Sequence, residues 1–434
     1  MSNCDIMKNR TKLTAFTSKK ATISNFWKGG MHLENIYKLY SSLTELEQQK
    51  TWAEIDLGAL RDNYRMLQNM IRARKQDTRI IAVVKAEAYG HGAPECVQTL
   101  LEEGCDFFAV SCIDEAVAVR VVCDNAQKDA DILILGYTQP SLAVHLSRYN
   151  IIQTLLSEDY AALLNLAAQT AGVTVRTHLA VDTGMNRIGF VAHSEEEILA
   201  TATAISRVQR FSNLCIEGMF THYSRADEAP FGEGDAQTAL QAERYRALIA
   251  HLEEREIRIP FHHSCNSAAT VRRPNDYQSG VRLGILLFGA RPSEHIELPL
   301  RPVMKLKTVI SHLHKLLPGE CVSYGGAFRA DSERLIATMP IGYADGFMRA
   351  YSGIDVTVHT TMGACRVPIV GRICMDQCMI DVTGTGAQIG DEVTLFGNDP
   401  TDLYDCASRA STIDYECLCL ISSRVTRKYV NDDR

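Results

Sequence analysis

With 434 residues, of which 46% are hydrophobic and 22% charged, the chain is long enough for two domains and apolar enough for a sizeable core. Its net charge of −7 and the lack of a long basic face argue against a nucleic-acid partner. No apolar run approaches the ~18 residues of a membrane helix and no signal-peptide core is visible, so we expect a cytoplasmic protein without a membrane span.

The 14 cysteines predict neither a disulfide framework nor a zinc site. No two of them have the C-x-x-C spacing that is typical of zinc and redox sites. Small, reduced core residues are the better interpretation for those in apolar segments, which are Cys96, Cys105, Cys112, Cys215 and Cys265. We therefore expect no metal site.

The first 50 residues differ in composition from the rest of the chain. Asp5 is the only acid among the first thirty positions, where six Lys and Arg side chains alternate with Ser and Thr. This pattern predicts a flexible extension or linker over 1–50, with a targeting role or attraction to anionic surfaces as the minor alternative. The stretch MHLENIYKLYSSLTELEQQ is compatible with one amphipathic helix. An upstream domain would join here if the chain is a fragment.

Between residues 51 and 295, short apolar runs alternate with segments of helical period. The expected strands are, in chain order, IIAVVK, FFAVS, DILILG, IIQTLL, RTHLAVD, CIEGMFTH, PFHHSCNS and VRLGILLFG. About eight strand–helix units over roughly 240 residues are typical of a (β/α)₈ barrel. A doubly wound open sheet is the alternative, but no G-x-G-x-x-G follows an early strand. We predict an α/β protein with an N-terminal TIM-like barrel.

From residue 296 to 434 the pattern changes to short strands separated by Gly, Pro and Asp turns. Segments such as KLKTVISHLHKL, RLIATMPIGY and CRVPIVGRICMDQCMIDV predict a second domain that is mainly β. A helix is expected near YDCASRA.

Polar residues follow the predicted barrel strands at their C-terminal ends, where barrel enzymes hold their working groups. Lys85 ends the first strand, Arg187 and His222 follow the fifth and sixth, and Arg282 lies on the eighth. A strand-end lysine alone more often reaches to the surface. One lysine together with fixed cations and neutral donors is, however, what pyridoxal 5′-phosphate requires, because a lysine can form a Schiff base with it. Ser267 and the Gly284–Ile285 backbone would contact its phosphate.

The chain resembles the alanine racemases, the barrel-type (fold type III) pyridoxal-phosphate enzymes, from Thr51 to Val430. The matching motifs are AVVKAEAYGHG, DTGMNRIGF, THYSRAD, NSAA, VRLGI, VSYGG, IGYADG, VGRICMDQ and TIDYE. The resemblance implies two-base interconversion of L- and D-alanine, which supplies D-alanine for peptidoglycan. It also implies a homodimer with shared active sites.

The resemblance assigns the two bases. Lys85 would hold the cofactor and serve one face of the substrate, and Tyr343 of the neighbouring subunit would serve the other. A free tyrosine titrates near ~10, so it needs nearby cationic character, for which His222 is the family's candidate.

The remaining roles concern the cofactor and the substrate. Arg282 would donate to the pyridine nitrogen and keep it unprotonated, which favours racemisation over transamination. Arg187 would contact the phenolic oxygen of the cofactor and the substrate carboxylate, which the Met375 N–H also holds. By the same resemblance, Tyr89 and Tyr415 contact the phosphate, and Asp227, Arg372 and Ile413 line the substrate entryway.

Two positions depart from the family pattern. Ala180 stands where many relatives have a lysine, often carbamylated, that braces the arginine; Arg187 therefore needs another brace. Glu87 stands where the family usually has Asn, and the sequence offers no partner for its carboxyl group.

Three other functions remain open at this point, and one of them, a broad-specificity racemase of larger amino acids, is a weaker alternative. A serine/alanine racemase of the vancomycin-resistance type shares the catalytic domain, although the bulky Tyr415 leaves little room for a hydroxymethyl group. A silent pyridoxal-phosphate carrier would keep the barrel but lack the β domain and its Tyr343.

Overall fold

The structure is a computed structural model that describes residues 50–431. The predicted N-terminal extension, with its expected helix, lies outside the described residues apart from Lys50. Residues from Thr51 onward form one compact unit, and the description below concerns that unit.

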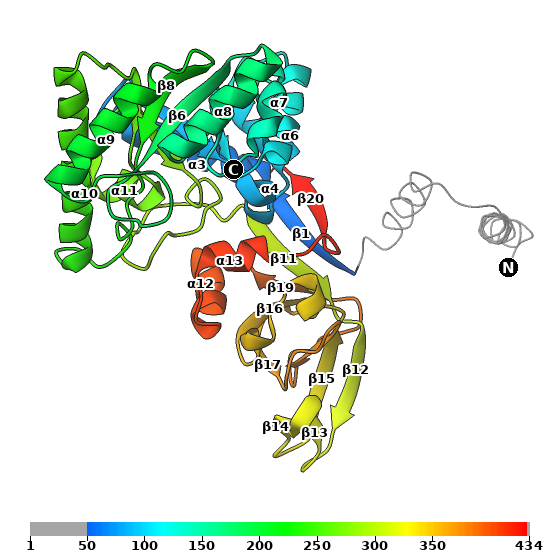
Figure 1. The fold of residues 1–434 in the computed structure, drawn as a ribbon. Helices are drawn as coiled ribbons and strands as arrows, with labels where there is room; N and C mark the ends of the chain where they lie inside the picture. The colour runs from blue at the N-terminus through cyan, green and yellow to red at the C-terminus, as the bar shows by residue number, and fades with distance from the viewer. Residues whose placement is uncertain (1–49, 432–434) are drawn as a thin grey trace, which may run out of the picture. The chain divides into compact units, whose positions relative to one another are not determined.

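Eight parallel strands close into a barrel (Figure 1). They are β2 (Arg79–Val83), β3 (Phe107–Val110), β4 (Asp131–Ile134), β5 (Ile152–Leu155), β6 (Val175–Asp182), β8 (Leu214–Phe220), β9 (Phe261–His263) and β10 (Gly280–Leu283). Each strand pairs with its neighbour in this order, and β10 returns to pair with β2. The predicted TIM-like barrel is confirmed.

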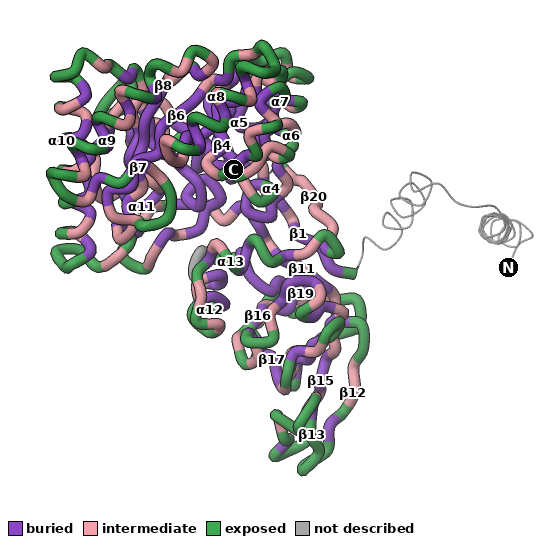
Figure 2. Tube along the Cα trace, in the orientation of Figure 1, coloured by how far each residue is buried: buried purple, intermediate pink, exposed green. Residues whose placement is uncertain are grey.

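Helices cover the outside of the barrel (Figure 1). They are α3 (Leu57–Arg72), α5 (Ala93–Glu102), α6 (Ile113–Asn125), α7 (Ala143–Arg148), α8 (Glu158–Ala171), α9 (Glu195–Val208), α10 (Glu233–Glu254) and the short α11 (Ser267–Arg272). In α3, Leu60, Tyr64, Leu67 and Ile71 form one buried stripe at helical spacing. Side-chain caps begin several helices; Asp56, for example, accepts the N–H of Ala59 at 2.9 Å. Figure 2 shows that the barrel strands are mostly buried, whereas the outer helix faces are exposed.

A second, mainly antiparallel sheet follows the barrel, as predicted. Its strands are β11 (Met304–Val309), β12 (His312–Leu316), β15 (Arg334–Met339), β16 (Asp355–Thr360), β17 (Gly363–Val370), β18 (Cys378–Asp381) and β19 (Glu392–Phe396). A small hairpin of β13 (Cys321–Val322) and β14 (Phe328–Arg329) and the helices α12 (Pro400–Arg409) and α13 (Asp414–Cys419) complete it. The helix α12 overlaps the one expected near YDCASRA.

The two ends of the described chain also join this second sheet. Strand β1 (Thr51–Asp56) pairs antiparallel with β11 and parallel with β20 (Thr426–Val430). Residues 51–56 therefore contribute no barrel strand, a distinction that hydrophobic periodicity does not make. The domain limits at 50 and 295 stay predictions.

The described cysteines are all free thiols. Cys96, Cys105 and Cys265 are buried as predicted, but Cys215 is exposed and Cys112 is half-buried. Cys215 lies in the first half of β8, where residues 215–217 are exposed or half-buried. Within residues 50–431, no group of three metal-ligating side chains gathers and no helix is long and apolar enough to cross a membrane.

Candidate active site

Lys85 follows the first barrel strand at the C-terminal mouth of the barrel, where it begins α4 (Lys85–Gly90). The side chain is half-buried, and its Nζ forms no hydrogen bond or ion pair with another described residue. Burial, and then the positive charge of Arg187, lowers the pKa of Lys85. Both causes favour the neutral amine, which is the nucleophilic form.

The turn after Lys85 has a left-handed backbone. Residues 86–89 all have φ between 51° and 55°, which costs roughly 1–2 kcal/mol for each non-glycine residue. Two carboxylates stabilise it: Glu115 accepts the N–H of Ala86 at 2.7 Å, and Glu87 accepts the N–H of Ala93 at 3.1 Å. The partner of Glu87 is therefore the first residue of α5. Sequence patterns missed this turn, because only glycine signals such a backbone reliably.

Tyr89 ends this turn and lies against the loop after the eighth strand. Its ring is buried, with its centroid 5.9 Å from that of Tyr415 on α13. The Gly284 N–H donates to Ser267 Oγ at 3.0 Å, so the Ser267 hydroxyl keeps its own proton for a further acceptor. Ile285, the next residue, is fully buried. The five predicted phosphate contacts thus come from the turn after Lys85, the start of α11, the loop after β10 and α13.

Arg282 on β10 is a buried guanidinium held by carbonyl groups. Its Nη atoms donate to the carbonyls of Thr221, His263 and Ser264 at 2.8–3.0 Å. Its Nε forms no hydrogen bond to a protein group among the described residues, so this donor is available. Burial lowers the pKa of Arg282 to about 10, which leaves it protonated at neutral pH.

His222 follows the sixth strand and lies beside Arg282. Its Nδ1 lies 3.3 Å from Nη2 of Arg282. Burial, followed by the charges of Arg282, Arg187 and Lys85, holds the pKa of His222 well below its usual value. Burial and the three neighbouring cations thus favour the neutral ring, whereas the resemblance had implied cationic character at His222.

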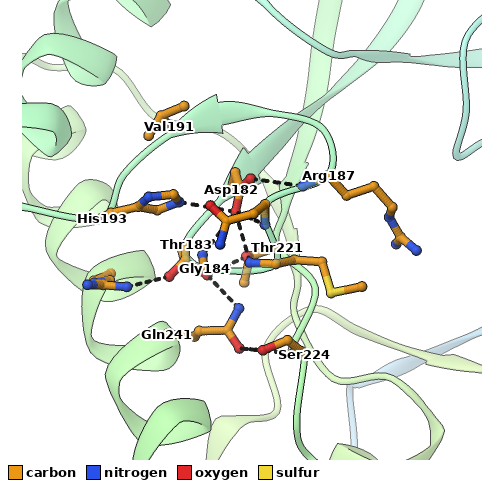
Figure 3. Close-up of polar contacts among 12 residues, drawn as sticks. Asp182, Thr183, Gly184, Arg187, Val191, His193, Thr221, Ser224 and Gln241 are labelled. Atoms are coloured by element: carbon orange, nitrogen blue, oxygen red, sulfur yellow. Dashed lines mark hydrogen bonds and ion pairs between the residues drawn. The ribbon is translucent and has the colours of Figure 1, made fainter.

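Arg187 is carried by a loop that Asp182 organises (Figure 3). Asp182 Oδ1 accepts the backbone N–H groups of 184–186 at 2.9–3.0 Å, and Oδ2 accepts that of Arg187 at 3.2 Å. His193 Nε2 also lies 3.3 Å from Oδ1. The exposed guanidinium of Arg187 points away from this cluster and forms no hydrogen bond to a described residue. The buried Ala180 provides no brace, in line with the sequence.

A polar network under this loop was not anticipated from the sequence (Figure 3). Thr183 and Thr221, which follow adjacent strands, share a hydrogen bond of 2.7 Å between their hydroxyls. Gln241 of α10 donates to the His222 carbonyl at 3.0 Å and accepts the Ser224 N–H at 2.9 Å. Gln241 thereby fixes the backbone that carries His222. No local motif signals it, since it lies nineteen positions along the chain.

Tyr343 and Met375 form a second group in the β domain. The Tyr343 N–H donates to the Cys374 carbonyl at 3.1 Å, and the Ala344 N–H donates to Met375 at 3.0 Å. The side chains are 45% and 54% exposed, and Met375 lines an open depression of about 580 Å³ with Tyr324. Among the described residues, no hydrogen bond joins Tyr343 to Lys85 or its neighbours. Within the described chain, the exposed Tyr343 and Met375 thus share no hydrogen bond with the residues at the barrel mouth.

The three predicted entryway residues are exposed. Asp227 acts electrostatically on Tyr415, which places it near the barrel mouth, and Ile413 immediately precedes α13. Arg372 instead lies in the β domain against Gly325, where an added Cβ would stand 2.9 Å from its Nη1. Asp227 and Ile413 therefore lie near the barrel mouth and α13, whereas Arg372 lies in the β domain.

Comparison with known proteins identifies close relatives. The family model "Alanine racemase, N-terminal domain" matches residues 55–292, and "Alanine racemase, C-terminal domain" matches 303–429. Alanine racemase 1 of Clostridium acetobutylicum is 40% identical over 388 residues, which cover 88% of this chain and 95% of that protein.

Solved structures show the same likeness. Alanine racemase of Clostridium difficile 630 superposes with a TM-score of 0.78 at 36% identity, covering 89% of this chain and 97% of that one. Alanine racemase of Bacillus anthracis with bound L-Ala-P has a TM-score of 0.77 at 31% identity, covering 89% and 96%.

Proposed function

The chain belongs to the alanine racemase family of pyridoxal-phosphate-dependent isomerases, and we propose that it interconverts L- and D-alanine with Lys85 and Tyr343 as its two bases. From its membership of this family we also propose that the enzyme is cytoplasmic and that it supplies D-alanine for peptidoglycan. The substrate is a small amino acid, and no metal takes part in the proposal.

The donor set at the barrel mouth fits pyridoxal phosphate. Lys85 offers an amine of lowered pKa, Arg282 offers an unpaired Nε–H, and Ser267 offers a hydroxyl proton. These groups match an aldehyde, a pyridine nitrogen and a phosphate respectively. When bound, the cofactor withdraws electrons from Cα and so acidifies its proton. Tyr89, Tyr415, Gly284 and Ile285 would border the phosphate, and His222 and Arg187 the ring.

The observation that best supports racemisation as the reaction type is the hydrogen bonding of Arg282. A guanidinium that stays protonated can only donate, so Arg282 would keep a pyridine nitrogen bound beside it unprotonated. By weakening the electron withdrawal of the ring in this way, Arg282 would favour return of the proton to Cα. Arg187 and the Met375 N–H would hold the substrate carboxylate, and Asp227, Arg372 and Ile413 would line the approach.

Racemisation needs one base on each face of Cα. Lys85 can serve one face, and the exposed Tyr343 is free to serve the other in the site of a neighbouring copy. We therefore propose a homodimer in which Tyr343 and Met375 of one chain complete the barrel mouth of its partner. Their exposure, and the lack of hydrogen bonds between them and Lys85 within the described chain, support this arrangement.

The alternatives from the sequence are less well supported. A serine racemase needs room for a hydroxymethyl group, whereas the buried face of Tyr415 lies against Tyr89. A cofactor carrier needs no second domain, yet this chain has one with Tyr343 exposed.

The proposal is tested by assay and by chemical labelling. The purified holoenzyme is expected to racemise L-alanine much faster than L-serine. Borohydride reduction followed by peptide mapping is expected to place the pyridoxyl label on Lys85. A label on another lysine would end the assignment of Lys85, and equal rates on both substrates would favour the serine/alanine racemase.

A further inference from the structure

Two buried histidines extend the hydrogen bonding of Arg282 across the barrel interior. Nη1 of Arg282 lies 2.7 Å from Nδ1 of His263 on β9, and Nε2 of His263 lies 3.1 Å from Nδ1 of His178 on β6. The exposed fractions of Arg282, His263 and His178 are 3%, 0% and 2%. The proposed chemistry so far uses neither histidine.

The barrel interior is shaped around these two rings. A Cβ at Gly218 on β8 would lie 2.5–2.6 Å from three atoms of the His178 ring, so only glycine leaves room for it there. Phe107 meets the same ring edge-on at 6.1 Å. The His263 ring stacks on Phe220 with centroids 4.8 Å apart. The positions of both rings are thus determined by packing as well as by hydrogen bonds.

The chemistry of arginine sets the direction of the hydrogen bonds. A guanidinium has donors only, so Nδ1 of His263 accepts from Arg282. A neutral imidazole carries one N–H, which for His263 must then be on Nε2 and donate to Nδ1 of His178. His178 in turn carries its proton on Nε2. The hydrogen bonds therefore all point in one direction: Arg282 donates to His263, and His263 donates to His178.

Both histidines are neutral in this arrangement. Burial, and then the charge of Arg282, holds the pKa of His263 well below its usual value. Burial also lowers the pKa of His178 to about 3; Asp131 opposes this effect, while Arg176, Arg79 and His262 add to it. Neutral rings provide the acceptor that a buried guanidinium needs without adding a second charge.

We propose that His178 is a positioning residue that acts through His263 on Arg282. It holds the His263 proton on Nε2, and so keeps Nδ1 as an acceptor that orients the guanidinium and leaves its Nε–H unpaired. The expected effect on the ratio of transamination to racemisation rests on the proposed function, whereas the tautomer of His263 does not. Removing the acceptor at His178 leaves the buried Nε2–H of His263 unsatisfied and allows Arg282 to shift.

The first test needs no variant and no activity. Nitrogen-15 NMR of histidine-labelled protein distinguishes protonated from unprotonated ring nitrogens, and the His263→Gln variant identifies the His263 signals. Nδ1 of His263 is expected to be unprotonated and Nε2 protonated, both in the apoprotein and with pyridoxal phosphate bound. A His263 tautomer with its proton on Nδ1 overturns the proposal.

The second test compares three variants. His178→Phe keeps a flat ring but has no acceptor, whereas His178→Asn places an amide oxygen near the position of Nδ1. His262→Phe is the matched control, because His262 is the neighbour of His263 on β9 but its ring forms a hydrogen bond with Tyr245 and none with Arg282, His263 or His178 among the described residues. Tautomer spectra are recorded for each, together with pyridoxamine phosphate formed per racemisation of alanine.

His178→Phe is expected to raise the ratio of transamination to racemisation about tenfold and to disturb the His263 tautomer. His178→Asn and His262→Phe are expected to remain near the parent protein. An unchanged ratio in His178→Phe, or equal changes in His178→Phe and His178→Asn, overturns the proposal. Failure of the parent protein to racemise alanine would instead sink the proposed function and leave the tautomer result standing.

Discussion

The hydroxyl group of Tyr89 occupies the space in which a side chain on Gly284 would begin. An ideal Cβ at position 284 would overlap Tyr89 Oη and lie 3.0 Å from Cζ. The turn after the first barrel strand and the loop after the eighth are thereby in direct contact. The backbone of Gly284 is not left-handed, so this close approach is the reason for glycine here.

Gly284→Ala is therefore expected to weaken pyridoxal phosphate binding about tenfold or more, because Tyr89 must move out of the proposed phosphate site. Titration of the apoprotein with the cofactor, followed by absorbance, measures this loss. In a Tyr89→Phe background the penalty is expected to shrink, since the overlapping oxygen is gone. An identical penalty in both backgrounds would show that the contact is not its cause.

Gly172→Ala provides the control for this experiment. Gly172 ends α8 with φ of 66° and has no atom within 4 Å of an added Cβ. The variant is expected to lose about 1 kcal/mol of unfolding free energy through backbone strain. Its cofactor affinity is expected to be unchanged.

Complementation between two inactive variants tests the shared site. Lys85→Ala and Tyr343→Phe chains are each expected to be nearly inactive alone. A mixed dimer of the two keeps one site with both bases, so random exchange is expected to restore about a quarter of the parent activity. Subunit exchange is verified by mass spectrometry of the intact dimers. No recovery after proven exchange would mean that each chain supplies its own tyrosine.

The Tyr343→Phe variant also separates the two faces of the substrate. We expect net racemisation to fall by ~10²–10⁴-fold, because each direction uses both bases. By the family's arrangement Lys85 serves the D-enantiomer and Tyr343 the L-enantiomer, so the α-proton of D-alanine is still expected to exchange with deuterium, since Lys85 alone can remove and return it. L-alanine is expected to exchange much more slowly. Proton NMR in deuterated buffer measures both, and comparable exchange rates would contradict the two-base assignment.

Asp414 makes the stability depend on pH with an unusual sign. It is buried at the start of α13, its Oδ2 has no partner, and burial raises its pKa to about 6. The folded protein therefore binds this proton more tightly than the unfolded chain. Asp414 therefore stabilises the folded protein through this proton below a pH of about 4. This contribution to the free energy of unfolding is lost as the pH rises through about 6.

Asp414→Asn stays neutral in both states. It is expected to raise the unfolding free energy by about 2–3 kcal/mol at neutral pH, with the gain shrinking towards a pH of about 4. Urea unfolding at fixed protein concentration over this range measures the effect. Asp276, a buried acid paired with Arg246 and Arg273, is the control. Asp276→Asn is expected to destabilise the protein at neutral pH; a similar loss in Asp414→Asn would refute the interpretation of Asp414.

Much of the architecture could be predicted from the sequence, because short apolar runs alternating with helical periods have few solutions. All eight barrel strands were located, and Lys85, Arg187, His222 and Ser267 follow the strands to which they were assigned. The sheet that β1 joins could not be predicted, since a strand pattern does not specify its partner. The roles of the site residues stay predictions, because they depend on a second chain and on the cofactor.

By itself, the sequence determined the fold class, the family and the identity of the residues at the barrel mouth, because these depend on residue order and local period. Only the tertiary structure decided the electrostatic states within the site. The pKa of His222 is lowered first by burial and then by the charges of Arg282, Arg187 and Lys85, which reach it from three different segments. The partner of Glu87 and the chain from Arg282 to His178 are likewise contacts between segments. Burial and distance set both the charge and the direction of such contacts, and neither quantity is encoded in local sequence spacing.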